Sequence, residues 1–220
     1  LFVDGMSKDG TRDIVNNYSK QYPFIRLLNN EKRIVPVAMN IGIKASIGDI
    51  VMRLDAHAQY PPNYFSVLVK ELVRLRADNV GVACKTDVLN KTSKTLAIRE
   101  VLSNRFGVGN STFRLGVDKV IEVDTVPFGC WKKDVFNKYG FYDERLIRNQ
   151  DIELNKRIVR GGGHIFIVPD TYCTYLARET FDGLAKNNFG NGKWNILTVY
   201  YTKQFKSLSV RHFIPLLFLL

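Results

Sequence analysis

Residues 3–11 read VDGMSKDGT, and the expected architecture of the chain follows from this run. The apolar residues before Asp4 resemble the end of a buried strand, and the closing DGT resembles the start of a helix. A carboxylate just past a strand end lies at the edge where open α/β sheets bind ligands. Asp4 can accept hydrogen bonds from a base or a ribose there, while Ser7 and Asp9 can cap the helix. Taken alone, the run fits an ordinary polar turn with an Asp cap somewhat better than a ligand site.

Outward from this run, short apolar stretches alternate with helical ones, which predicts an α/β domain with a largely parallel sheet. In the first half we expect strands at 24–28, 49–54 and 80–83, and helices at 9–20, 37–46 and 61–75. In the second half we expect strands at 120–126 and 164–168, a glycine-rich turn at 106–110, and helices at 94–104, 151–160 and 181–204.

The composition fits one globular domain and narrows the class of partner. The chain has 220 residues, of which 45% are hydrophobic, and it carries 32 basic against 21 acidic residues, a net charge of +11. This excess suits nucleic acid, an anionic membrane or phosphorylated ligands, and it does not choose among them. The 3 cysteines are far apart and lack CxxC spacing, so neither a disulfide framework nor a zinc site is expected.

A second polar cluster ends the buried strand expected at 49–54. Residues 51–58 read VMRLDAHA, with Asp55 and His57 two positions apart. Where a strand frays into a loop, this spacing lets both side chains reach one ion together with diphosphate oxygens. The imidazole suits a metal such as manganese. Alternatively, Asp55 caps the next turn and His57 is an ordinary loop histidine.

A third cluster stands at the helix expected over 151–160. Asp151 lies at its N-terminus, where the helix dipole stabilises a carboxylate, and Leu154, Ile158 and Val159 form the expected inward stripe. As an isolated feature, Asp151 could be no more than an N-cap.

In this order the three clusters resemble family 2 glycosyltransferases. The family's V-D-D-G-S-x-D-G-T corresponds to residues 3–11, its metal-binding Asp-x-Asp to residues 55–57, and its catalytic Glu-Asp to residues 150–151. More narrowly, LDAHA, DTVPFG and RNQDIELN are similar to bacterial succinoglycan-type exopolysaccharide glucosyltransferases; they occupy residues 54–58, 124–129 and 148–155. The resemblance extends from Leu1 to about Trp194.

The resemblance implies a GT-A fold, with a mostly parallel central sheet flanked by helices and a first strand missing from this sequence. Residues 1–180 would form the catalytic domain. The implied activity is an inverting transfer from a nucleotide-sugar, of the UDP-sugar or UDP-glucose kind, to a saccharide or lipid-linked acceptor in polysaccharide biosynthesis.

The resemblance also assigns roles to residues of this chain. Asp151 would be the catalytic base, Asp4 and Asp55 would bind the nucleotide, and Asp55 with His57 would hold Mn²⁺ or Mg²⁺. Three further side chains would contact the diphosphate or the acceptor: Arg53, Arg148 and Gln150.

Two of these positions depart from the family pattern. His57 replaces the second carboxylate of Asp-x-Asp, and Gln150 replaces the Glu before the base, which removes an acidic neighbour of Asp151. The narrower group shares both departures, so they are interpreted as variants of a working site.

Residues 181–220 form a basic and aromatic region expected to meet an anionic membrane surface. From Gly183 onward there are five basic residues and no acidic one; the basic residues are Lys186, Lys193, Lys203, Lys206 and Arg211. Aromatic residues lie between them, namely Phe189, Trp194, Tyr200, Tyr201 and Phe205. This pattern favours a helix lying on a bilayer, at the cytoplasmic face of a bacterial inner membrane. The apolar run 213–220 either opens a membrane segment or packs on the core.

Two other functions fit parts of the sequence. A sugar nucleotidyltransferase would share the fold, but it normally carries a glycine-rich basic signature near its first strand, and Asp151 at a helix start favours glycosyl transfer. A non-catalytic basic module fits the charge, but no RNP-like aromatic pair, GXXG loop or zinc finger indicates nucleic-acid binding, and no nucleic-acid partner is expected.

Overall fold

The computed structural model describes residues 1–108, 111–208 and 212. Arg211 and the apolar run 213–220, which the sequence analysis assigns to a membrane-facing tail, lie outside the described residues.

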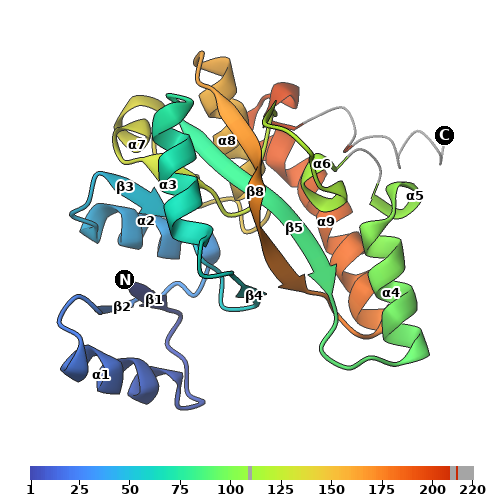
Figure 1. The fold of residues 1–220 in the computed structure, drawn as a ribbon, viewed down its shortest axis with the longest axis horizontal. Coiled ribbons are helices and arrows are strands. Elements are labelled where there is room, and N and C mark those ends of the chain that lie inside the picture. The colour runs from blue at the N-terminus through green and yellow to red at the C-terminus, as the bar shows by residue number, and fades with distance from the viewer. Residues whose placement is uncertain (109–110, 209–211, 213–220) are drawn as a thin grey trace.

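Strands and helices alternate along the chain (Figure 1). The strands are β1 (Phe2–Asp4), β2 (Leu27–Asn29), β3 (Ile50–Met52), β4 (Ala58–Gln59), β5 (Asn79–Asp87), β6 (Ile121–Glu122), β7 (Cys130–Lys132) and β8 (Ile165–Leu176). The helices are α1 (Thr11–Gln21), α2 (Val35–Ala45), α3 (Tyr64–Arg74), α4 (Ser93–Ser103), α5 (Arg105–Val108), α6 (Thr112–Leu115), α7 (Asp134–Tyr139), α8 (Gln150–Arg160) and α9 (Phe181–Thr202). A 3-10 turn, η1 (Phe205–Ser207), follows α9.

The strands form two sheets, and the larger one is mixed. β1 and β2 pair in parallel as a small sheet, and β3-β7-β5-β8-β4 form the larger sheet, with β6 added to β8. In the larger sheet only β5 and β8 are parallel, whereas the other four described pairings are antiparallel. The α/β class is confirmed, but the expected largely parallel order is wrong. Short strands such as β7 enter the sheet without the helical crossover that parallel neighbours require.

β5 and β8 form the long central pair, and both extend beyond their expected ends at 83 and 168. Val82 pairs with Val168 but Ala83 pairs with Tyr172, so residues 169–171 bulge out of the ladder. Pro169 and Asp170 belong to this bulge, after which the strand resumes. The resumed strand brings Tyr175 beside the segment that contains His57.

Helices cover the larger sheet through buried apolar stripes. α3 packs against β5, β7 and β8, and its Leu68 and Leu72 are fully buried. α8 buries Leu154 and Ile158, but Val159 is 39% exposed, so its expected place in the inward stripe is wrong. The expected strand 120–126 is reduced to Ile121–Glu122.

α1, β1 and β2 form a lobe at one end of the molecule, and α4 and α9 lie at the other (Figure 1). α9 begins after Thr180, whose hydroxyl accepts a hydrogen bond from the Gly183 N–H at 3.1 Å. None of the helices in the described part of the chain combines the length and apolar character needed to cross a bilayer.

Candidate functional site

A buried arginine holds the first candidate carboxylate. β3 ends at Met52, and the next backbone N–H, of Arg53, bonds to the Gly129 carbonyl at 3.1 Å. The Arg53 guanidinium is directed at Asp55: its Nε donates to Oδ1 at 2.7 Å and its Nη2 to Oδ2 at 2.8 Å. The Arg53 side chain is only 8% exposed, so this bidentate pair lies mostly out of water. The Asp55 carboxylate is therefore fixed in position and partly neutralised.

His57 stands beside Asp55 at the mouth of the site. Its Nε2 lies 4.0 Å from Asp55 Oδ2, and 59% of its side chain is exposed. Neighbouring ligands of an octahedral ion about 2.1 Å away lie roughly 3.0 Å apart, so the exposed His57 side chain has to approach Asp55 to share an ion with it. Among the described residues no third His, Cys, Asp or Glu joins them in a metal-holding group. The pair therefore fits a cation whose other ligands come from substrate phosphates and water, as is usual for magnesium.

Arg53 also links this strand end to the start of α8. Burial disfavours its charged form, but hydrogen bonds to Asp55 and the nearby charges of Asp55 and Asp151 outweigh burial and raise the pKa of Arg53. Tyr142 is enclosed in the same place, and burial raises the pKa of its hydroxyl. The charges of residues 55 and 151, distant in sequence, thus both act on one guanidinium, and among the described residues Asp55 is the carboxylate bonded to it.

Asp151 is held much more loosely than Asp55. It is the second residue of α8, and its Oδ1 accepts a hydrogen bond from the adjacent Ile152 N–H at 2.9 Å. The N-cap position belongs to Asn149, with φ 61°, so the interpretation of Asp151 as a plain N-cap is wrong. Glu153 is buried and bound by Arg157 through Nε at 3.0 Å and Nη2 at 2.6 Å. Asp151 is therefore the carboxylate of this turn that no cationic side chain holds by a hydrogen bond within the described residues.

Three buried polar atoms near Asp151 have no hydrogen-bond partner in the described part of the chain. They are Arg53 Nη1, Tyr142 Oη and Gln150 Oε1. Arg53 and Tyr142 lie close together, since the guanidinium opposes the burial that raises the pKa of the Tyr142 hydroxyl. Buried polar groups in folded proteins nearly always have partners, so Gln150 Oε1 is an atom whose bonding a ligand or water can complete. Gln150, 7% exposed, thus lies in the interior wall and not on the open surface.

The loop before α8 is tied to α9. Arg148 Nη1 donates to the side-chain oxygens of Asn187 at 2.9 Å and Asn191 at 2.7 Å. Asn149 Nδ2 donates to Asn195 Oδ1 at 3.0 Å and to Thr198 Oγ1 at 3.3 Å. One polar face of α9 therefore fixes the segment that leads into Asp151.

Asp4 lies in the N-terminal lobe and has its own set of hydrogen bonds. Its carboxylate accepts hydrogen bonds from the Ser7 N–H and hydroxyl and from Arg12 Nη1, at 2.9, 2.5 and 2.8 Å. The Ser7 hydroxyl bond first, and Arg12 next, lower the pKa of Asp4 to about 2 although burial opposes them. The expected helix cap by Ser7 is wrong, because Ser7 bonds to Asp4, whereas Asp9 does accept the Thr11 N–H at 3.2 Å.

Strained backbone flanks all three carboxylates. Met6, Phe128 and Asn149 have φ values of 63°, 59° and 61°, in the left-handed region that non-glycine residues avoid. Met6 follows Asp4, Phe128 packs under the Arg53 guanidinium at 5.8 Å, and Asn149 precedes α8. Such strain is often found where surrounding structure must hold functional groups.

The structure thus brings together five of the residues singled out in the sequence, namely Arg53, Asp55, His57, Gln150 and Asp151. Within residues 1–108, 111–208 and 212, no hydrogen bond or ion pair joins Asp4 to Asp55 or Asp151, and Arg148 turns to α9. Sequence reasoning missed Arg12, Tyr142 and Tyr175. Their roles depend on long-range packing, and no local motif marks them.

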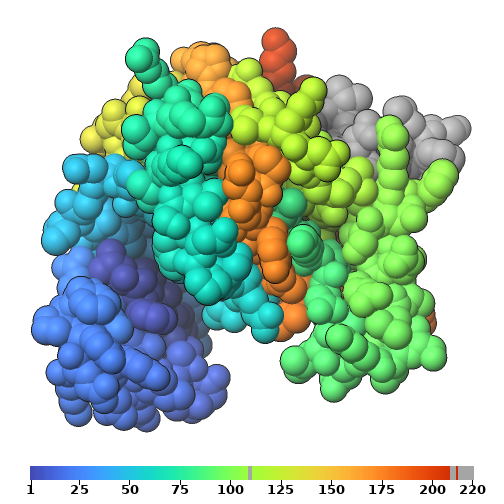
Figure 2. Space-filling model, in the orientation of Figure 1, coloured from blue at the N-terminus to red at the C-terminus, as the bar shows by residue number. Residues whose placement is uncertain are grey.

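Figure 2 shows where a substrate can approach this site. The molecule is hollowed along its lower edge, between the blue N-terminal lobe and the green segment around α4. Cyan atoms of the chain around β4 and orange atoms of β8 lie between these two walls. The exposed His57 directly precedes β4, so the Asp55–His57 pair adjoins this hollow.

Comparison with known proteins identifies the family. The model of glycosyl transferase family 2 matches residues 1–140. The chain belongs to glycosyl transferase family 2. Among curated members it is 30% identical over 205 residues to the succinoglycan biosynthesis protein ExoA of Rhizobium meliloti (strain 1021), covering 88% of this chain and 58% of that protein.

A second relative comes from an archaeon. The dolichyl N-acetyl-alpha-D-glucosaminyl phosphate 3-beta-D-2,3-diacetamido-2,3-dideoxy-beta-D-glucuronosyltransferase of Methanococcus voltae is 25% identical over 197 residues, covering 87% of this chain and 61% of its own length. The chain thus spans about three fifths of either relative.

Among solved structures, GalNAc-T7 with UDP, GalNAc and Mn²⁺ superposes with a TM-score of 0.59 at 18% identity, covering 80% of this chain and 37% of that one. The likeness shows a GT-A fold in a family 2 chain, as the resemblance implied, although the larger sheet is mixed.

Proposed function

We propose that the protein is an inverting glycosyltransferase that moves a sugar from a UDP-sugar to a saccharide or lipid-linked acceptor in polysaccharide biosynthesis. One observation carries the proposal. Arg53 is hydrogen-bonded to Asp55, which follows a strand in the first half of the chain, and its pKa is also raised by the charge of Asp151, at the start of a helix in the second half. Single-displacement transfer needs one carboxylate beside the sugar donor and another beside the acceptor hydroxyl, close to each other.

The proposed chemistry divides between these carboxylates. Asp151, which no cationic side chain among the described residues holds by a hydrogen bond, takes the proton from the acceptor hydroxyl as the hydroxyl oxygen bonds to the anomeric carbon. The bond from that carbon to the donor diphosphate breaks, and the nucleoside diphosphate leaves. Inversion follows, because the acceptor attacks from the side opposite the leaving group.

Asp55 and His57 are the residues that would hold a divalent metal ion. Such an ion offsets the negative charge that develops on the leaving diphosphate. Arg53 fixes the Asp55 carboxylate, so we assign it a positioning role besides any contact with the diphosphate. GalNAc-T7 with Mn²⁺ supports the assignment by fold similarity.

Asp4 is the proposed contact to the nucleotide base. Its oxygens already accept three hydrogen bonds, and a carboxylate offers about four acceptor sites, so one remains for an N–H of uracil. The lowered pKa keeps Asp4 an acceptor throughout the physiological range.

Calorimetry of UDP binding tests the metal assignment. We expect binding with Mn²⁺ at least as tight as with Mg²⁺, and none with EDTA. A parallel screen of UDP-, GDP- and dTDP-sugars for metal-dependent hydrolysis by the full-length protein identifies the donor. Undiminished UDP binding in EDTA would contradict the proposal.

We also propose that the protein works at the cytoplasmic face of a bacterial inner membrane, through α9. Five of its residues follow one another at intervals of three and four, which places them on one face: Lys186, Phe189, Lys193, Ile196 and Tyr200. Lys203, the residue after the helix, lies over the Tyr200 ring at 4.1 Å from its centre. Phe189, Ile196 and Tyr200 are 77%, 67% and 61% exposed, opposite the asparagine face that binds the Arg148 loop. Trp194 stacks on Tyr201, with ring centres 6.4 Å apart, and both are half-buried, so these two aromatics lie outside the exposed stripe.

Vesicle sedimentation tests this surface. Each lysine near an anionic bilayer contributes about 1 kcal/mol, so changing Lys186, Lys193 and Lys203 to Glu should abolish pelleting with phosphatidylglycerol vesicles. A triple change of the exposed Lys8, Lys20 and Lys70, on other elements, provides the matched control and should pellet like the wild type. Equal pelleting of both variants would refute the membrane assignment of α9.

A further inference from the structure

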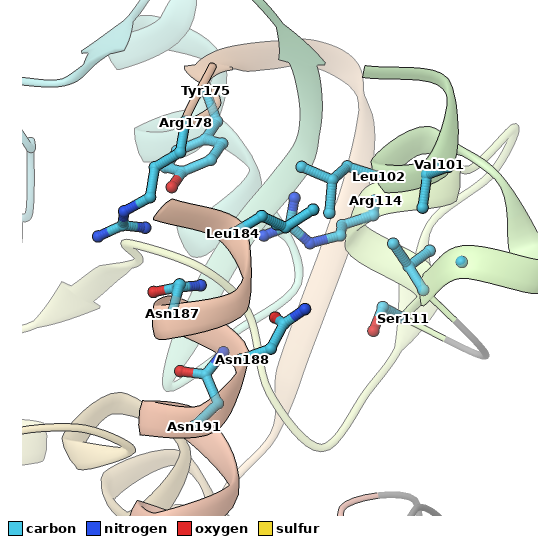
Figure 3. A pocket seen from close by; sticks show the side chains of 12 residues that line it. Val101, Leu102, Ser111, Arg114, Tyr175, Arg178, Leu184, Asn187, Asn188 and Asn191 are labelled. Carbon is cyan, nitrogen blue, oxygen red and sulfur yellow. The ribbon is translucent and has the colours of Figure 1, made fainter. Parts of the chain in front are cut away.

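A pocket of about 230 Å³ lies between the α4–α6 segment and α9 (Figure 3). In Figure 3 the asparagines of α9 form one wall, Val101, Leu102 and Ser111 form the opposite wall, and Arg114 reaches between them. Tyr175 and Arg178, near the end of β8, close one side. None of the roles assigned above uses this pocket.

The pocket is positively charged without local compensation. None of its described lining residues is acidic, whereas Arg114 and Arg178 both face it. Within the described part of the chain neither arginine forms an ion pair; Arg114 donates to the Thr86 hydroxyl at 3.2 Å and lies 5.5 Å from the Tyr175 ring centre. Arg148, which also lacks a described ion pair, adds a third guanidinium behind Asn187 and Asn191. Guanidinium groups gathered without carboxylates favour an anionic ligand, most strongly a phosphate.

The pocket adjoins the catalytic site on two sides. Its Tyr175 ring packs edge-on against His57, with ring centres 5.4 Å apart, and Tyr175 pairs with Ala58 across β4 and β8. On the other side, Asn187 and Asn191 line the pocket and accept hydrogen bonds from Arg148, three residues before Asp151. A molecule in this pocket therefore lies next to both the metal pair and the loop of the proposed base.

The remaining lining groups suit a sugar. The side-chain amides of Asn187, Asn188 and Asn191 and the Ser111 hydroxyl offer both donors and acceptors, and the Tyr175 ring offers a flat apolar face. We infer that this pocket binds the acceptor, and that the acceptor is a saccharide bearing a phosphate group, which Arg114 and Arg178 recognise. The inference rests on the proposed function and adds the chemical class of the acceptor to it.

NMR signals of the asparagine side-chain amides report directly whether a ligand binds in this pocket. With UDP and Mg²⁺ at saturation to fill the donor site, glucose 1-phosphate should shift the amide signals of Asn187, Asn188 and Asn191, and glucose should shift them far less. Arg178→Gln should weaken glucose 1-phosphate binding about tenfold, since a charge-assisted hydrogen bond is lost. Arg178 is exposed and makes no hydrogen bond among the described residues, so this variant should fold.

The control is Arg160→Gln, an exposed arginine at the end of α8, which should bind glucose 1-phosphate like the wild type. Unshifted asparagine signals, or equal shifts with glucose and glucose 1-phosphate, would overturn the inference. So would inorganic phosphate that binds as tightly as glucose 1-phosphate, because the pocket would then recognise an anion alone. An Arg178→Gln variant that weakens UDP instead would assign the pocket to the donor.

A second probe distinguishes two sources of the phosphate. An octyl glucosyl phosphodiester joins the same sugar and phosphate to a lipid-like chain. Tighter binding than glucose 1-phosphate supports a lipid-linked acceptor, and equal binding supports a soluble sugar phosphate; either result agrees with the inference. Failure of UDP to bind at all would count against the proposed function only, because the asparagine signals still report the pocket.

Discussion

The strand end at Asp55 and the helix start at Asp151 lie near the same arginine, but they hold their carboxylates in different ways. Asp55 receives two short hydrogen bonds from Arg53, whereas Asp151 receives one from its own helix backbone. A carboxylate held by two hydrogen bonds from a buried guanidinium keeps one position, which suits a ligand for metal and diphosphate. A carboxylate without such a cationic partner keeps its oxygens available to an acceptor hydroxyl. The difference assigns donor binding to the first region and acid–base chemistry to the second.

Removing the loosely held carboxylate should have the largest effect. Asp151→Asn should lower the rate of sugar transfer by about 10²–10⁴-fold, the usual loss for a positioned general base. Turnover with the donor found in the nucleotide-sugar screen is the measurement.

Asp134→Asn is the matched control for that variant. Asp134 is an exposed carboxylate in the first turn of α7, so its loss should leave turnover unchanged. An Asp151→Asn variant with most of its turnover would move the base elsewhere. Glu153 is a poor substitute, because Arg157 already binds both of its oxygens.

The clamp on Asp55 should matter for stability. Two Arg–Asp pairs in the chain have similar bidentate geometry and the same two-residue separation, but the Arg53 side chain is 8% exposed and that of Arg145 is 60% exposed. Arg53→Met removes two hydrogen bonds that a buried guanidinium donates to the Asp55 carboxylate, and it should lower the free energy of unfolding by about 1.5–3 kcal/mol. Arg145→Met should cost less than about 1 kcal/mol. Urea unfolding measures both, and equal losses would mean that burial does not distinguish the two regions.

We expect α9 to affect the transfer rate by positioning Asp151, not through the charge of the helix. Asn149→Gly keeps the left-handed backbone but loses the bonds to Asn195 and Thr198, so transfer should slow by less than the about 10²–10⁴-fold expected for Asp151→Asn. Asn149→Ala adds the steric penalty of a left-handed alanine, about 1 kcal/mol in unfolding free energy relative to the glycine variant. Wild-type turnover in both variants would show that α9 does not position the base.

Asp4 is a third carboxylate to compare, and we expect its replacement to have the smallest effect of these variants. Its folded pKa of about 2 lies below the ordinary value of 3.8, so its contribution to stability is full above pH 4 and disappears as the pH falls through 2. Asp4→Asn should therefore flatten the acid limb of the stability curve between pH 4 and 2. Asp13→Asn, an exposed change on α1, should leave that limb as it is. A limb unchanged by Asp4→Asn would contradict the lowered pKa.

The sequence predicted most helices and the order of the three clusters, because amphipathic periodicity and turn residues are local signals. α3 and α8 begin and end within about three residues of their expected bounds. The continuation of β8 past Pro169 could not be predicted, because only its pairing with β5 shows that residues 169–171 form a bulge. The joint effect of Asp55 and Asp151 on Arg53, and the docking of α9 on the Arg148 loop, likewise depend on contacts between distant residues.

The division of labour between Asp55 and Asp151 is tested most directly by calorimetry of UDP with Mn²⁺, run on Asp55→Asn and Asp151→Asn beside the wild type. We expect Asp55→Asn to lose metal-dependent UDP binding, and Asp151→Asn to bind UDP as the wild type does while failing to transfer sugar. Undiminished binding by Asp55→Asn, or an equal loss in both variants, would contradict this division of labour.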